Sequence, residues 1–115
     1  MVLKMTNREV DGVTVVTLDG RIVLGDESIA LRDAVKGLLA DGKKKIVLNA
    51  NNITMIDSSG LGILVGLYSS AKSAGGAVRL CQLGTKFREV LQITKLITLF
   101  DVYNTEAEAV KSFSK

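Results

Sequence analysis

The sequence predicts an α/β domain built on a largely parallel sheet, and three observations predict it. Short apolar runs typical of buried strands alternate with segments whose apolar residues recur at helical spacing. The chain opens with two β-favouring runs joined by Asp11-Gly12, a dipeptide that favours a tight hairpin turn. Its 115 residues contain no linker, internal repeat or low-complexity tract. We therefore expect a single domain over residues 1–115, with a mixed, mostly parallel sheet, an N-terminal antiparallel hairpin and about four helices.

The expected strands begin with the two arms of the hairpin, residues 3–10 and 13–18. Asp19-Gly20 then punctuates the chain before a brief apolar segment at 21–24. Fully apolar runs are typical of strands that are covered on both faces of a sheet. Later strands are expected at residues 46–48 and 77–83, with a small strand or extended loop at 53–56 and a candidate last strand at 97–100.

Helical spacing of apolar residues marks the segments between these strands. A first helix is expected from Asp26 onward, with Gly42 as its stop signal. A second is indicated by the apolar spacing over 61–71 and ends at Gly75-Gly76.

Two further helices are expected in the last third of the chain. Phe87, Val90 and Leu91 indicate a short third helix. Thr105 and Glu108 form a capping box, which predicts a terminal helix that runs to Phe113.

Composition excludes several classes of chemistry. The chain has no histidine, the commonest general base and metal ligand. Cys81 is the sole cysteine, so neither an internal disulfide nor a thiolate cluster can form. Because Cys81 lies in an apolar run, we interpret it as a buried, inert thiol. We expect no metal site and no histidine-dependent catalysis.

Neither a membrane nor a nucleic acid is expected as a direct partner. Hydrophobic residues make up 47% of the chain, but no apolar stretch approaches the ~18 residues that span a bilayer, and no signal-peptide pattern is evident. The net charge is +3, and the run Lys43-Lys44-Lys45 is short and lacks interleaved aromatic residues. We interpret these lysines as a solvated turn and expect a cytoplasmic protein.

Three short motifs imitate catalytic or cofactor sites but lack the required context. Residues 37–44 resemble a phosphate-binding loop, yet the glycines end a helix and Lys44 replaces the magnesium-binding hydroxyl. Gly60-Leu61-Gly62 imitates a dinucleotide fingerprint without its third small residue or acidic partner. Ser69-Ser70-Ala71-Lys72 fits the Ser-x-x-Lys pattern without its companion motifs. We therefore expect no cofactor.

The segment Asp57-Ser58-Ser59-Gly60-Leu61-Gly62 stands where a strand is expected to turn into the second helix. Asp and Ser are preferred at helix N-caps because their side-chain oxygens accept hydrogen bonds from otherwise unpaired N–H groups. Gly60 and Gly62 each cost a helix about 1 kcal/mol relative to Ala, so their presence indicates that something approaches the backbone closely. Physics alone leaves two interpretations open: a tightly packed helix start and a functional site.

The sequence around this segment resembles the STAS domain, and specifically the bacterial anti-sigma factor antagonists. The likeness covers nearly the whole chain, and its centre is the Asp-Ser-Ser-Gly core at residues 57–60. Besides the opening hairpin, the residues that carry it lie at 46–62, 75–76, 78–80 and 91–96.

The resemblance implies a regulatory protein without catalysis of its own. In the family, the serine that follows the aspartate is phosphorylated by the anti-sigma factor, an ATP-dependent serine kinase, and the matching residue is Ser58. The unphosphorylated form binds that kinase and releases the sigma factor, whereas the phosphorylated form does not bind. A PP2C-type phosphatase resets the switch. The kinase supplies ATP and magnesium, and the partner-binding loop comprises Asp57, Ser58, Ser59, Gly60, Leu61 and Gly62.

The resemblance also implies a second partner-facing loop, Leu24, Gly25 and Asp26. Many relatives place an aspartate shortly after the glycine that ends the second strand. Here the first acidic residues after Gly20 are Asp26 and Glu27, so the chain departs from the family pattern at this loop. The identity of the partner therefore stays open.

Two other functions stay open as well. One is an interaction subunit of a lipid-transport ABC system, which docks on an ATPase without a phosphorylation cycle. The other is a small nucleotide- or anion-binding module that uses Gly60-Leu61-Gly62 and the following helix N-terminus. For the protein itself we expect a monomer or a weak dimer.

Overall fold

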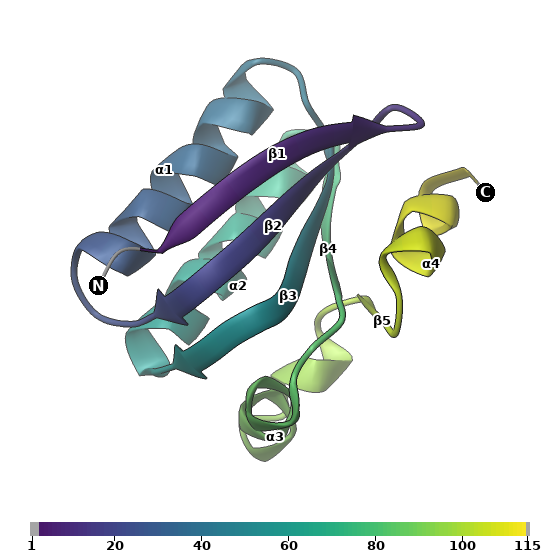
Figure 1. Cartoon of the computed structure of the whole chain (residues 1–115). Helices are drawn as coiled ribbons and strands as arrows, with labels where there is room; N and C mark the ends of the chain where they lie inside the picture. The colour runs from purple at the N-terminus through teal and green to yellow at the C-terminus, as the bar shows by residue number, and fades with distance from the viewer. Residues whose placement is uncertain (1–2, 115) are drawn as a thin grey trace.

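A five-stranded mixed sheet in the order β1-β2-β3-β4-β5 organises the computed structural model, which describes residues 3–114 (Figure 1). Residues 1, 2 and 115 of the predicted domain lie outside the described residues. Strands β1 and β2 are antiparallel and every other pair is parallel, which confirms the predicted α/β class and its hairpin. The strands are β1 (Lys4–Val10), β2 (Val13–Ile22), β3 (Lys45–Ile56), β4 (Ala77–Cys81) and β5 (Val102–Tyr103).

The hairpin forms where the sequence predicts it, because both turn residues adopt positive φ. Asp11 has φ 51° and Gly12 has φ 80°, the geometry of the primed turns that match the twist of paired strands. Strand β2 does not end at Asp19-Gly20 but continues to Ile22. A register shift against β3 beside Gly20, which has φ 130°, accommodates the glycine without breaking the strand.

Strand β3 is a single long strand rather than two short ones. Residues 46–50 are buried, and the second half is largely exposed. Asn51 and Asn52, which lie between the two predicted segments 46–48 and 53–56, stand at the first register shift against β2. The Oδ1 atom of Asn49 accepts a hydrogen bond of 3.0 Å from the backbone N–H of Asn51 and satisfies a donor at this irregularity.

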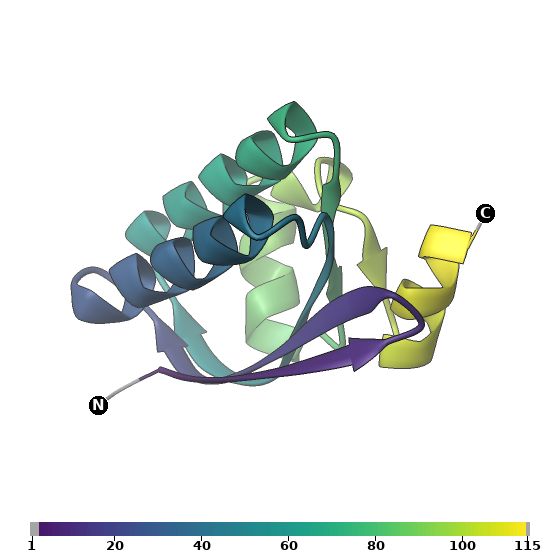
Figure 2. The ribbon, with the colours of Figure 1, turned by 90° about the horizontal axis from the view of Figure 1, so that it is seen from above.

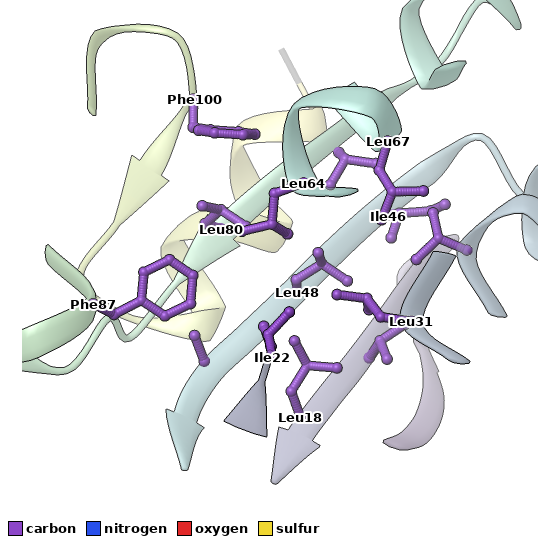
Figure 3. Close-up of a cluster of buried hydrophobic side chains, with 14 of the residues drawn as sticks. Leu18, Ile22, Leu31, Ile46, Leu48, Leu64, Leu67, Leu80, Phe87 and Phe100 are labelled. Atoms are coloured by element: carbon purple, nitrogen blue, oxygen red, sulfur yellow. The ribbon is translucent and has the colours of Figure 1, made fainter. Parts of the chain in front are cut away.

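Three helices cover one face of the sheet and a fourth covers the other (Figure 2). The main core is formed by apolar side chains of the sheet and the three helices, together with Phe100 from the segment after η1, and is rich in leucine and isoleucine (Figure 3). No helix within residues 3–114 has the length and apolar character that crossing a membrane requires. The helices are α1 (Asp26–Ala40), α2 (Ser58–Ser73) and α3 (Thr85–Ile93) on the first face and α4 (Glu106–Lys111) on the second, with short 3-10 turns η1 (Leu96–Thr98) and η2 (Ser112–Ser114).

The predicted last strand at 97–100 is wrong. This segment forms η1 and a turn, and Phe100 is buried, with its ring meeting that of Tyr68 edge-on at 5.7 Å between centroids. Its apolar side chains therefore serve helix-to-sheet packing rather than strand pairing. The strand follows instead at Val102–Tyr103, where two residues pair with β4.

Helix α4 begins at the predicted capping box. Thr105 accepts from the N–H of Glu108, and the Glu108 side chain accepts from the N–H of Thr105. The helix ends at Lys111, and a 3-10 turn continues the chain to Ser114 instead of the predicted α-helix to Phe113.

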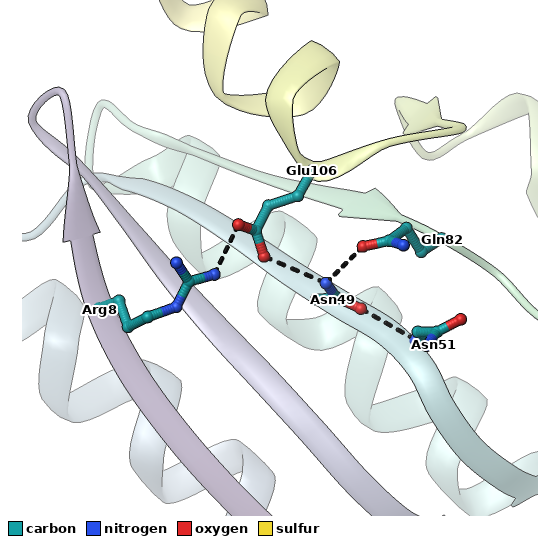
Figure 4. A network of polar contacts seen from close by, with 5 residues as sticks. All are labelled: Arg8, Asn49, Asn51, Gln82 and Glu106. Atoms are coloured by element: carbon teal, nitrogen blue, oxygen red, sulfur yellow. Dashed lines mark hydrogen bonds and ion pairs between the residues drawn. The ribbon is translucent and has the colours of Figure 1, made fainter.

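A polar network ties the start of α4 to the sheet (Figure 4). Glu106 accepts hydrogen bonds from Arg8 of β1 and from Nδ2 of Asn49 on β3, and the same Nδ2 donates to Gln82. The Arg8 guanidinium, followed by the Asn49 amide, lowers the pKa of Glu106 below its usual value. This network closes the second face and lies away from the site described next.

Candidate functional site

The predicted site lies at the edge of the sheet where the parallel strands β2 and β3 end. Helix α2 begins beside the ends of these two strands (Figure 1). Ser58 is the first residue of this helix and is exposed. In open parallel sheets, this carboxyl edge is where binding sites gather, because loops and helix N-termini meet there. The hydroxyl of Ser58 is therefore accessible to a partner at the positive end of the helix dipole.

The carboxylate of Asp57 links two segments at this edge of the sheet. Its Oδ1 accepts a 2.9 Å hydrogen bond from the N–H of Gly60 and so caps α2, while its Oδ2 accepts a 2.9 Å bond from the N–H of Leu24. These bonds, first from Gly60 and then from Leu24, lower the pKa of Asp57 below its usual value. One carboxylate thus joins α2 to the loop between β2 and α1, which are far apart in sequence.

Gly60 is required by the protein's own packing. A Cβ atom there would lie 2.1 Å from the carbonyl oxygen of Ile22 and 2.8 Å from its Cγ2. The last residue of β2 therefore occupies the space that a side chain at position 60 would need. The sequence indicates that something approaches the backbone here, and at Gly60 this neighbour is β2 of the same chain.

Packing within the fold does not require a glycine at position 62. No atom lies within 4 Å of a Cβ built at Gly62 or Gly66, and both residues are exposed within a regular helix. Ser58, Gly62, Gly66, Ser69 and Ser73 follow one another at helical spacing and are all exposed. Among the exposed residues of α2, Lys72 is therefore the only one with a side chain larger than serine, although glycine disfavours helix formation.

The other predicted residues of the segment divide between core and surface. Leu61 is buried in the main core and anchors the first turn of α2, and its N–H bonds to the carbonyl oxygen of Asp57 at 2.9 Å. Ser59 is half-buried. A partner arriving from solvent would therefore meet Ser58 and Gly62 rather than Gly60 or Leu61.

The predicted loop Leu24, Gly25 and Asp26 lies beside this edge. Leu24 is 76% exposed although its N–H is bonded to Asp57. Gly25 has φ 113° and turns the chain into α1, whose first residue, Asp26, is exposed.

Sequence reasoning missed Met55 as a member of this surface. It is 53% exposed and lies two residues before Asp57, opposite Arg21 of β2 in the sheet register. The apolar pattern marked it as a strand residue. The irregular register near the end of β3, which leaves its side chain in solvent, has no signature in the sequence.

The motifs set aside in the sequence occupy ordinary structural positions. Gly37 lies within α1 and Gly42 just beyond its C-terminal end, rather than at a helix start. Cys81 is fully buried, and burial raises the pKa of its thiol to about 12. Among residues 3–114, no cluster of three or more carboxylates or thiols is placed to hold a metal ion.

Comparisons with known proteins agree with this architecture. A family model of the STAS domain matches residues 4–109. The chain is 25% identical to the anti-sigma F factor antagonist of Paenibacillus polymyxa over 99 residues, which cover 86% of this chain and 85% of the relative.

Solved structures show the same fold. An anti-sigma factor antagonist from Mycobacterium paratuberculosis superposes with a TM-score of 0.84 at 25% identity, covering 98% of this chain and 95% of that one. The Bacillus cell fate determinant SpoIIAA, in its phosphorylated form, superposes with a TM-score of 0.73 at 21% identity, covering 96% and 99%. Because the STAS-domain model matches residues 4–109, which is nearly the whole chain, the chain belongs to the STAS-domain family.

Proposed function

We propose that this protein is an anti-sigma factor antagonist that binds an anti-sigma serine kinase while Ser58 is unmodified and is released when Ser58 is phosphorylated. The observation that carries the proposal is the exposed hydroxyl of Ser58 at the first position of α2, within the Asp57–Gly62 segment of a STAS domain. Supporting it, one solved neighbour, SpoIIAA, is described in a phosphorylated form.

At the position of Ser58, phosphorylation is expected to affect binding much more than it affects the stability of the fold. A phosphate adds about −1.5 to −2 charges, and a helix N-terminus favours such charge by roughly 0.3–1 kcal/mol. At a closed interface, an unpaired or like-charge contact costs several kcal/mol, and every 1.4 kcal/mol weakens binding tenfold. Asp57, fixed beside the phosphate by two hydrogen bonds, adds repulsion. The effect on binding is therefore the larger of the two.

The docking surface in this proposal comprises the exposed residues of the Asp57–Gly62 segment, the loop Leu24–Asp26 and the solvent face of α2. Gly62 and Gly66 support the inclusion of α2 because nothing inside the fold requires them. A partner backbone or side chain can approach this helix more closely than a helix with larger residues would allow. Relative to alanine, each exposed glycine costs the helix about 1 kcal/mol of stability.

The phosphoryl transfer itself is assigned to the partner. The Oγ of Ser58 attacks the γ-phosphorus of ATP, the bond to the β-phosphate oxygen breaks, ADP leaves, and the hydroxyl proton passes to a base of the kinase. The kinase supplies ATP and magnesium. A PP2C-type phosphatase then hydrolyses phospho-Ser58 and returns the protein to its binding form.

The direct test is to incubate the purified protein with the cognate anti-sigma serine kinase, ATP and magnesium and to locate the phosphate by mass spectrometry. We expect one phosphate on Ser58, none on the Ser58→Ala variant, and unchanged phosphorylation of Ser59→Ala as a matched control. In calorimetric titrations, Ser58→Ala is expected to bind the kinase like the wild type, and Ser58→Asp at least tenfold more weakly.

Phosphate on another residue, or equal binding by the wild type and Ser58→Asp, would contradict the proposal. Weak binding by a folded Ser58→Ala protein would count against a switch that depends on added charge. Co-purification with an ABC ATPase and with no sigma regulator would favour the alternative of a transport subunit.

A further inference from the structure

A hollow of about 110 Å³ opens between the second half of β3 and helix α3, which pack against each other. Its floor is the ring of Phe87, which is buried in the main core (Figure 3). The apolar residues that line this β3–α3 hollow are Ile53, Met55 and Ile56 of the strand and Phe87 and Val90 of the helix.

The apolar walls of the hollow are left partly in solvent. Met55 is 53% exposed, and Ile53, Ile56 and Val90 are half-buried at the margin of the main core. Exposed apolar side chains that are scattered singly over a surface are ordinary. These four line one concavity instead, and a concave apolar surface with a few polar groups is the usual form of a ligand site.

One cation stands among the apolar side chains. Lys86 is the only charged residue that lines the hollow, and its ammonium group forms no ion pair with any of residues 3–114. The other polar side chain of the lining, Thr54, donates its hydroxyl hydrogen to the carbonyl oxygen of Gly20 at 3.1 Å. A molecule in the hollow would therefore meet apolar walls and one ammonium that lacks an anionic partner.

The size and charge of the hollow define what it can hold. An apolar cavity of about 150 Å³ is known to hold benzene, so a hollow of about 110 Å³ that opens to solvent suits one ring or one branched chain of about six carbons. A single ammonium matches a single negative charge. Phosphate groups carry more charge and are favoured by the forked guanidinium of arginine, and no arginine lines this hollow.

We propose that the β3–α3 hollow binds a small monocarboxylate, whose ring or branched chain packs against the apolar walls and whose carboxylate pairs with the ammonium of Lys86. The walls belong to a strand and a helix that already pack on the main core, so binding requires little ordering of the protein. Ser58 does not line the hollow, and the inference does not depend on the proposed function.

The test is an NMR titration of the ¹⁵N-labelled protein with benzoate, up to about 20 mM at constant ionic strength and pH 7. We expect saturable binding with a Kd of roughly 1 mM, and the largest shifts at the amides of residues 53–56 and 86–90. Benzamide has the same shape without the charge and is expected to bind about 3- to 10-fold more weakly. Phenyl phosphate is expected to bind no more tightly than benzoate.

Three variants separate the charge from the cavity. Lys86→Gln is expected to weaken benzoate binding about 3- to 10-fold and to leave benzamide binding unchanged. Lys36→Gln, the same substitution at an exposed lysine of α1, is the matched control and should bind both like the wild type. Val90→Phe fills the hollow and should weaken both ligands at least tenfold. Thermal unfolding checks that the variants fold, and Met55→Trp, at a largely exposed lining position, replaces Val90→Phe if that variant is unstable.

Several results would overturn the proposal. Shifts that do not saturate, or that centre on residues outside the hollow, mean that the site does not exist. Equal benzoate affinities of Lys86→Gln and the wild type remove the ion pair, and phenyl phosphate binding tenfold more tightly than benzoate gives the site to a different class of ligand. None of these results bears on Ser58, because no kinase is present in the titration.

Discussion

Asp57 shows how one side chain can set the geometry of a whole surface. Its two oxygens accept hydrogen bonds from Gly60 and Leu24, so the start of α2 and the β2–α1 loop share an anchor. The sequence predicts the cap, because Asp is a preferred N-cap residue directly before a helical pattern. The bond to Leu24 could not be predicted, since it joins residues 33 positions apart and depends on β2 and β3 ending side by side.

This double role predicts a pH-dependent loss of stability in Asp57→Ala. At pH 7 the free energy of unfolding of the variant is expected to be about 1 kcal/mol lower than that of the wild type, because the N-cap is lost. The folded pKa of Asp57 lies below its usual value of 3.8, so the carboxylate stabilises the fold above pH 3.8 and this contribution fades as the pH falls through the folded pKa.

Urea unfolding at pH 7, 5 and 3 or below measures the effect. The difference between the wild type and Asp57→Ala should be constant from pH 7 to 5 and should shrink on acidification below 3.8. Asp41→Ala is the control, because no hydrogen bond or ion pair of the Asp41 side chain is found among the described residues. A difference that stays the same at every pH would show that the charge of Asp57 contributes nothing.

At the scale of elements, helix α2 is packed on one side and exposes mainly glycine and serine on the other. Its buried face carries Leu61, Leu64 and Ala71, which the apolar spacing predicts, together with Leu67. Its first two glycines look alike in the sequence but differ in the structure, since a Cβ atom at Gly60 would collide with Ile22 of β2 and a Cβ atom at Gly62 would meet open space. Only the position of β2 distinguishes them.

Substitution by alanine should therefore lower the free energy of unfolding at Gly60 and raise it at Gly62. Gly60→Ala forces a Cβ against the Ile22 carbonyl and is expected to cost about 1–3 kcal/mol of unfolding free energy. Gly62→Ala, in open space within a helix, is expected to add up to about 1 kcal/mol. Urea denaturation of both variants measures this, and a destabilised Gly62→Ala protein would be contrary to the structure.

Element boundaries were predictable where a local signal decides them. Asp11-Gly12 and the box formed by Thr105 and Glu108 are local hydrogen-bonding and dihedral preferences, and both are confirmed. The prediction for segment 97–100 was wrong because a short apolar run is equally compatible with a buried strand and with a turn that places Phe100 in the core.

At the scale of the whole molecule, the sheet separates the site from the rest of the fold. The Arg8–Glu106–Asn49 network and α4 close one face of the sheet (Figure 4). Helix α2, whose first residue is Ser58, begins at the edge opposite the hairpin turn (Figure 1). The proposed switch at Ser58 would therefore act on binding without disturbing the core.

We expect phosphorylation of Ser58 to change the unfolding free energy by no more than about 1 kcal/mol, because the charge lies at the favourable end of α2. Glutamate substitutions test the same reasoning without a kinase. Ser58→Glu is expected to leave stability unchanged or slightly raised, and Ser73→Glu, at the exposed C-terminal end of the same helix, to lower it by roughly 0.3–1 kcal/mol. Thermal unfolding at low salt measures both, and a larger loss for Ser58→Glu than for Ser73→Glu would refute the electrostatic argument.

By itself, the sequence determined the α/β class, the opening hairpin, the caps of α2 and α4 and the segment that carries Ser58. These depend on residues within a few positions of one another, whose preferences act locally. Only the tertiary structure decided that the N–H of Leu24 bonds to Asp57 and that Met55 is exposed. It also decided that β2 leaves no room for a side chain at Gly60 but that there is room at Gly62. The reason is that strand register and the packing of α2 on the sheet bring distant residues together, and no local pattern encodes those distances.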